Sequence, residues 1–293
     1  MKQTILKYSS LLALLGSPLI SSQTYAAECA TGASPDDSCT IDVSNTTYTL
    51  TGDINTNTTD NIIDFGDGAN SNTVNFIGDI TSEGLDARAF SFSDNDGNTL
   101  TMTGNIITEG NAAEGIKLFP GVTNANIDIT GNITTTGVGS DGLFLLESDS
   151  NTTNLTGNIT TTGIGSVGLV LSFSDSNTTN ITGNITSSSD GVWLFVSDSN
   201  TTNITGNIST TGENNDGLRL QDSDSNITTL TGNITTAGGG AAGLFLFGDS
   251  NTTSLTGNIT TTGDSARGLD FNNGDSNITT LTGNITTAGA SAV

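Results

Sequence analysis

Large apolar side chains recur at two positions of a repeated segment, and among the residues of this chain they are the best suited to bind another molecule. Each follows a recurring glycine by two or four residues, while the first and third residues after that glycine are apolar in every copy. Alternate side chains of a strand face opposite sides, so this set is expected to face solvent. Its members are Phe144, Val170, Trp193, Phe195, Phe245 and Phe247.

Exposed aromatics at this density often mark a binding surface, and we expect a receptor or a glycan to dock there. The alternative is that an absent segment or self-association covers the stripe. Between Gly183 and Gly191 the connecting loop is three residues shorter than in most copies. This shorter loop is expected to uncover Trp193, the only Trp.

A column of aspartates is the second recurring feature that could do chemistry. Stacked one strand apart, at about 4.8 Å, such carboxylates repel each other unless they are solvated or bridged, and calcium could bridge them. The glycine-rich nonapeptide of calcium-binding β-rolls is absent, however. We therefore expect no metal site and interpret these residues as turn caps, with calcium as the weaker alternative. The column is Asp149, Asp175, Asp198, Asp224, Asp249 and Asp275.

The sequence contains few combinations of residues that could catalyse a reaction. The chain has no histidine, which excludes a histidine-based triad and histidine metal ligands. Paired acids such as Asp94 and Asp96 could in principle hydrolyse glycosides, but the basic residues are scattered over distant repeats. We expect no enzyme activity and no cofactor, and keep a polysaccharide-degrading β-helix enzyme as an alternative.

These side chains must be positioned by a repeat. The segment Leu155–Thr160 reads Leu-Thr-Gly-Asn-Ile-Thr, and its copies are 23 to 27 residues apart. A fixed period in this range predicts stacked structural units. The central glycines are Gly52, Gly78, Gly104, Gly131, Gly157, Gly183, Gly206, Gly232, Gly257 and Gly283.

Each unit contains strands rather than helices. An Ile stands two residues after every central glycine and a large apolar residue two before it, with polar residues between. This alternation indicates strands with one buried face. One unit buries too few apolar side chains to offset the entropy of ordering it, so the units must stack. We predict an all-β fold: a single right-handed parallel β-helix of about ten rungs over residues 51–293.

The N-terminal residues predict export. Residues 1–26 have the basic start, short apolar core and small residues before the cleavage point of a secretory signal peptide. Cys29 and Cys39, the only cysteines, follow it, and an exported chain favours a disulfide between them. We interpret residues 27–50 as a disulfide-tied N-terminal cap that protects the first strand edge.

The charge balance excludes several partners. The chain has 30 acidic and 6 basic residues, a formal net charge of −24. Phosphate binding requires a basic footprint, so neither nucleic acid nor anionic lipid is an expected partner. The acidity is typical of a soluble surface protein.

The signal peptide followed by Thr-, Asn- and Gly-rich rungs, with the Leu-Thr-Gly-Asn-Ile-Thr and Gly-Leu-x-Leu motifs, resembles the passenger region of bacterial autotransporters over residues 28–293. These are type V secreted β-helical adhesins. The resemblance implies export through the inner membrane, passage through a C-terminal outer-membrane barrel, and display at the surface or outside of a Gram-negative bacterium. A host receptor or glycan would be the partner.

This chain lacks the barrel, and its last rung stops before the Gly-Leu strand. We interpret it as a fragment or a truncated passenger, whose open rod end could self-associate.

An ice-binding protein is a further alternative to adhesion. Thr156, Asn158, Thr160 and Thr162 are expected to face solvent in a row that neighbouring rungs nearly repeat. Ser or Ala at positions 188, 237 and 288 weakens the row, and the lattice is expected to slip at the 23-residue rung. Adhesion or structural display is therefore the preferred interpretation.

Overall fold

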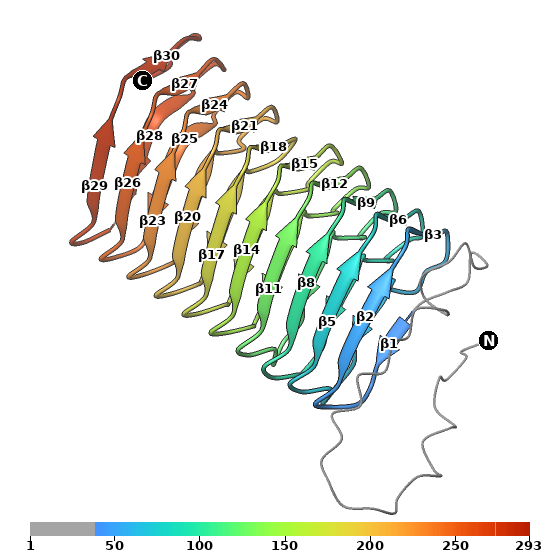
Figure 1. The fold of residues 1–293 in the computed structure, drawn as a ribbon. Helices are drawn as coiled ribbons and strands as arrows, with labels where there is room; N and C mark the ends of the chain where they lie inside the picture. Colours follow the sequence, from blue (N-terminus) through green and yellow to red (C-terminus); the bar gives the residue numbers. More distant parts are fainter. Residues whose placement is uncertain (1–38, 273) are drawn as a thin grey trace, which may run out of the picture.

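The computed structural model describes residues 39–272 and 274–293, which wind into an elongated right-handed coil (Figure 1). Each turn adds one short strand to each of three parallel ten-stranded sheets. The prediction of an all-β parallel β-helix with about ten rungs is confirmed. None of the described residues belongs to a helix long and apolar enough to cross a membrane.

We name the sheets A, B and C. Sheet A contains β2 (Thr47–Thr51), β5 (Thr73–Ile77), β8 (Thr99–Thr103), β11 (Asn126–Thr130), β14 (Thr152–Thr156), β17 (Thr178–Thr182), β20 (Thr201–Thr205), β23 (Ile227–Thr231), β26 (Thr252–Thr256) and β29 (Ile278–Thr282). Sheet B contains β1 (Cys39–Ile41), β4 (Ile63–Phe65), β7 (Phe90–Phe92), β10 (Ile116–Leu118), β13 (Leu143–Leu146), β16 (Leu169–Ser172), β19 (Val192–Phe195), β22 (Leu218–Gln221), β25 (Ala242–Phe247) and β28 (Arg267–Phe271). Sheet C contains β3 (Ile54–Thr56), β6 (Ile80–Ser82), β9 (Ile106–Thr108), β12 (Ile133–Thr135), β15 (Ile159–Thr161), β18 (Ile185–Ser187), β21 (Ile208–Thr210), β24 (Ile234–Thr236), β27 (Ile259–Thr261) and β30 (Ile285–Thr287).

The central glycine of the repeat makes the corner between sheets A and C. Gly157 has φ 153°, and a Cβ there would lie 1.9 Å from the carbonyl oxygen of Gly131 in the preceding turn. Only glycine tolerates that approach. The chain thus leaves sheet A at Thr156 and enters sheet C at Ile159, whose side chain is fully buried.

The register of the sheets survives the 23-residue turn. Thr178 pairs with Thr201 in sheet A, and Ile185 pairs with Ile208 in sheet C. The expectation that the lattice slips here is wrong, because the missing residues come from the corner loop between β18 and β19. A corner loop lies outside the sheets and absorbs the difference in length.

A buried asparagine ladder holds the corner that leads into sheet A. The Asn151 backbone N–H donates to Oδ1 of Asn177 at 2.8 Å, and Nδ2 of Asn177 donates to the Ser148 carbonyl at 2.9 Å. The same bonds continue through Asn200 and Asn226. Each amide satisfies backbone groups that a corner would otherwise leave unpaired, which makes these buried polar residues structural.

The first described strands lie in the segment for which a cap was expected. Cys39 is buried at the start of β1, which pairs with β4, and β2 pairs with β5. Residues 1–26 and Cys29 lie outside the described residues. The signal peptide and the disulfide between Cys29 and Cys39 therefore stay predictions.

Candidate binding site on sheet B

The predicted contact residues lie on the outer face of sheet B, in two columns that run along the rod. The first column reads Phe144, Val170, Trp193, Arg219 and Phe245, one residue per turn. The second reads Leu146, Ser172, Phe195, Gln221 and Phe247. The structure thus brings all six predicted residues onto one face, with Arg219 and Gln221 between them.

Val170 departs from the expectation of exposure, since it is only 4% exposed. It stands between the larger residues Phe144 and Trp193 in the ladder. The five predicted aromatic residues are half-buried, because stacked neighbours cover one another. Val170 therefore forms part of the floor of the site and not of its contact surface.

Two residues that sequence reasoning missed extend the site. Phe173 and Val196 directly follow β16 and β19, and are 49% and 37% exposed. Both have left-handed backbone conformations, with φ 51° and 47°. Bulky or β-branched residues rarely adopt this conformation. The equivalent residues of neighbouring turns are Glu147, Asp222 and Gly248, so the sequence signal was an apolar residue at a polar or glycine position.

The added residues join the predicted ones in one cluster. The rings of Phe173 and Phe195 meet edge to face with centroids 5.4 Å apart, and the Trp193 ring also lies with its centroid 5.4 Å from that of Phe195. We call Phe173, Trp193, Phe195 and Val196 the aromatic patch. It spans two adjacent turns, next to the shortened corner loop.

Arg219 borders the aromatic patch on the next turn. Its guanidinium carbon lies 5.5 Å from the Trp193 ring centroid and 5.1 Å from that of Phe245. Nε and Nη2 donate to Oε1 of Gln221 at 3.1 and 2.8 Å. Cation–π contacts and the Gln221 amide thus hold the guanidinium against the outer face of sheet B.

Two buried carboxylates lie beside that guanidinium. Oδ2 of Asp190 and of Asp216 are 3.9 and 3.8 Å from Nη1 of Arg219, and both residues are 5% exposed. Their Oδ1 atoms accept the backbone N–H groups of Asp216 and Ala242 at 2.5 and 2.6 Å. Burial raises the pKa of Asp190 to about 6 and that of Asp216 to about 7.

A second charged cluster, nearer the N-terminus, is internally paired. Glu114 accepts from Nε of Arg88 at 2.6 Å and from Nζ of Lys117 at 2.7 Å. Lys117 also stands 4.9 and 4.6 Å from the ring centroids of Phe119 and Phe144. All three charged residues are buried. This cluster has the partners that a buried charge needs, and we interpret it as structural.

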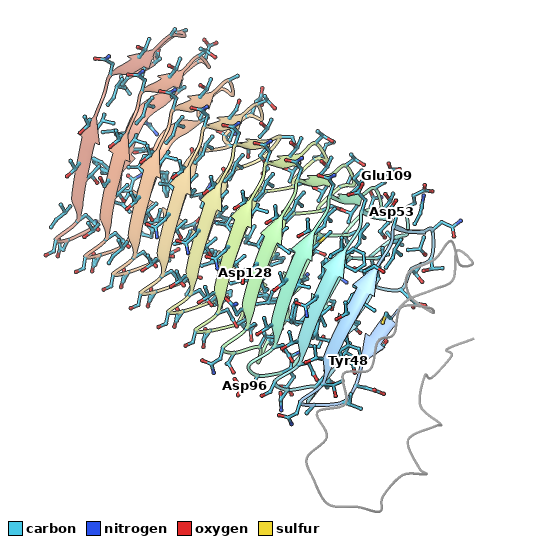
Figure 2. The ribbon with its side chains drawn as sticks, viewed as in Figure 1. Tyr48, Asp53, Asp96, Glu109 and Asp128 are labelled. Carbon is cyan, nitrogen blue, oxygen red and sulfur yellow. The ribbon has the colours of Figure 1, made fainter. Side chains whose placement is uncertain are left out.

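The aspartate column lies along an exposed corner, on the side of the rod where Figure 2 labels Asp96. Oδ1 of Asp149 accepts the backbone N–H of Asp175 at 2.7 Å, and the same bond links Asp175 to Asp198 and continues to Asp275. Among the described residues, no group of three or more acidic, His or Cys side chains is arranged to hold a metal ion. Each carboxylate from Asp149 to Asp249 therefore accepts a hydrogen bond from the backbone amide of the aspartate in the next turn.

The polar row considered for ice binding is not flat. Thr156 ends β14 on sheet A and Thr160 lies in β15 on sheet C, with the Gly157 corner between them. The flat array is instead the outer face of sheet A, where Thr152, Asn154 and Thr156 point outward on one strand. Neighbouring strands repeat this arrangement in register.

No protein-family model matches the chain, and no curated protein or solved structure is significantly similar to it.

Proposed function

We propose that this chain is the rod of a surface-displayed β-solenoid adhesin, similar to an autotransporter passenger, which binds a host receptor or glycan at the aromatic patch. The signal-peptide pattern of residues 1–26 supports export, and the acidic composition suits a soluble surface protein. The solenoid supports display, because a rigid scaffold holds a variable surface in a fixed place. No catalytic role is part of the proposal.

The observation that carries the proposal is that Phe173 and Val196 are apolar, exposed residues whose backbone is held in a strained left-handed conformation. A sparsely populated backbone conformation costs about 1–3 kcal/mol for each residue. Neighbouring turns make the same corner with Glu147 or Gly248, so the fold itself does not require apolar side chains here. Binding is a reason to keep apolar side chains beside Trp193 and Phe195.

The test separates binding from stability. Trp193→Ala should lower attachment of the purified chain to host cells and to receptor or glycan arrays at least tenfold. Phe173→Asn should lower attachment as well but raise the urea midpoint, because asparagine tolerates the left-handed region. Ile77→Ser is the matched control, since Ile77 is 58% exposed at the end of β5 in sheet A, several turns from the patch. Full attachment by Trp193→Ala would overturn the proposal.

A second candidate function rests on the outer face of sheet A. Thr occupies most outward positions there, and on the described strands Asp128, labelled in Figure 2, is the only charged one. Nδ2 of Asn180 donates to Asn154 at 2.8 Å, which fixes the central column. A water molecule that makes one hydrogen bond of about 2.8 Å to a side chain on each of two neighbouring strands nearly spans the strand spacing of about 4.8 Å. This flat neutral face suits the ordering of water at an ice surface.

Thermal hysteresis tests this second function. The chain should slow the growth of ice, and Thr182→Lys in the middle of sheet A should abolish the effect. Thr186→Lys, an equally exposed threonine of sheet C, should leave it intact. Absence of hysteresis in the unmodified chain would contradict ice binding and would not affect the adhesin proposal.

A further inference from the structure

Polar groups with unused hydrogen-bonding capacity stand at the edge of the aromatic patch. A guanidinium has five N–H donors, and Gln221 occupies those of Nε and one of Nη2 on Arg219. Nη1 is 3.8 and 3.9 Å from the carboxylates of Asp216 and Asp190, distances too long for a hydrogen bond. Arg219 therefore retains donors for an oxygen of a ligand.

The indole of Trp193 adds an orphaned donor. Its Nε1–H is covered and has no acceptor within the described part of the chain. An unsatisfied buried donor costs about 1–3 kcal/mol, and an acceptor supplied from outside the chain is one way to satisfy it. Trp193 and Arg219 are paired neighbours on β19 and β22, so the two unsatisfied groups lie together.

The local charge argues against an anionic ligand. At pH 8, above their raised pKa values of about 6 and about 7, the nearly buried carboxylates of Asp190 and Asp216 are both ionised and stand beside the single positive charge of Arg219. The whole chain carries a net charge of −24, which repels anions at longer range. An acceptor bound by Arg219 is therefore favoured if it is uncharged, such as a hydroxyl, a ring oxygen or an acetamido carbonyl.

The aromatic rings supply the remaining contact. Trp193, Phe195 and Phe245 are half-buried on the outer face of sheet B, and their faces can pack against apolar C–H groups. A sugar ring presents an apolar C–H face together with a rim of hydroxyls. We propose that the site formed by the aromatic patch, Arg219 and Gln221 binds saccharides that carry no negative charge. This inference rests on the proposed function and names its ligand class.

The first experiment compares neutral with acidic oligosaccharides. The purified full chain is titrated with a panel of neutral and N-acetylated oligosaccharides and with sialylated, uronic and sulfated counterparts of the same length. The neutral members should bind at least tenfold more tightly. Arg219→Met, which keeps an unbranched apolar stem in place of the arginine stem and removes the N–H donors, should weaken that binding about tenfold, whereas Arg267→Met on the same sheet should not change it.

The second experiment tests the charge argument directly. Binding is measured at pH 8, above the raised pKa values of both groups. The double variant Asp190→Asn and Asp216→Asn keeps an acceptor oxygen for the backbone N–H groups of Asp216 and Ala242 and removes the two negative charges present at that pH. It should bind the acidic oligosaccharides at least tenfold more tightly than the unmodified chain, with neutral binding little changed. The far-UV CD spectrum and urea midpoint of each variant verify folding. Unchanged selectivity in a folded double variant would overturn the inference.

The experiments distinguish a failure of the saccharide inference from a failure of the adhesin proposal. If the chain binds no oligosaccharide but attaches to a host protein, and Trp193→Ala removes that attachment, the saccharide inference is wrong and the adhesin proposal stands. Tighter binding of acidic than of neutral oligosaccharides by the unmodified chain would also overturn the inference. If Trp193→Ala changes neither attachment nor oligosaccharide binding, both proposals fail.

Discussion

The N-terminal and C-terminal turns share one backbone geometry but differ in what fills the rod. In sheet A, the second residue of each strand points inward, and in the earlier turns it is apolar: Val74, Leu100 and Ile127. In later turns the same column is Thr153, Thr179, Thr202, Thr228 and Thr253. The earlier turns also stack Phe65 on Phe92, with ring centroids 4.1 Å apart.

Turns with the same backbone geometry therefore need not contribute equally to the stability of the rod. The five inward threonine hydroxyls are buried and have no hydrogen-bond partner within residues 39–272 and 274–293. Each costs about 1–3 kcal/mol relative to a satisfied or apolar side chain. Because each turn contacts only its neighbours, the later turns should open locally before the earlier ones.

The largest effect is expected in the aromatic N-terminal core. Phe92→Ala removes a fully buried ring and its stack with Phe65, and should lower the free energy of unfolding by about 3–5 kcal/mol. Urea titrations followed by far-UV CD report all turns, whereas Trp193 fluorescence reports the later ones. The two curves should be separate in the unmodified chain and converge in Phe92→Ala.

The exposed ring of Phe271 supplies the control. Phe271→Ala should leave both midpoints within about 0.5 kcal/mol. A cost below about 1 kcal/mol for Phe92→Ala would contradict a stronger N-terminal core.

The next largest effect is expected when the inward residue types of sheet A are exchanged between the earlier and the later turns. Thr179→Val removes a buried unpaired hydroxyl at constant shape and should stabilise the later turns by about 1–2 kcal/mol. Val74→Thr makes the reverse change in the earlier turns and should cost a similar amount. Trp193 fluorescence should report the first change more strongly, and CD the second. If Thr179→Val destabilises the rod, an internal water must bind the threonine hydroxyls.

Stability should also depend on pH through the central and later turns. Burial raises the pKa of Asp141 to about 7, of Asp190 to about 6 and of Asp216 to about 7, from an ordinary value of 3.8. The folded chain then binds more protons than the unfolded chain between these values, so stability falls as pH rises from about 4 to 7. The urea midpoint from Trp193 fluorescence should be higher at pH 5 than at pH 8. Asp216→Asn should reduce that difference, and a midpoint that rises with pH would refute the assignment.

Calcium removal should have the smallest effect. Oδ1 of each corner aspartate from Asp149 to Asp249 already accepts a backbone N–H. Excess EDTA should therefore leave both unfolding midpoints unchanged, and added calcium should not raise them. A calcium-dependent rise seen by Trp193 fluorescence alone would place an ion on the later part of the column.

The sequence predicted the features that apolar periodicity encodes. The Ile column and the corner glycines located the strands of sheet C and their inward face. Thr153 and Asn151 escaped notice because their neighbours are also polar, so alternation carries no signal for inward threonine or asparagine. Val170 was placed on the correct face but not at the correct depth, since its burial depends on the size of Phe144 and Trp193 in adjacent turns.

The register that persists across the shortened corner loop has an evolutionary consequence. Thr178 still pairs with Thr201 although that turn has three fewer residues than its neighbours. Replication slippage or unequal recombination between the near-identical repeats would add or delete whole turns, and each product would keep its pairing partners. Small in-frame deletions within a corner are tolerated for the same reason. Rod length can therefore change in a single genetic event, while the aromatic patch stays intact on the turns that carry it.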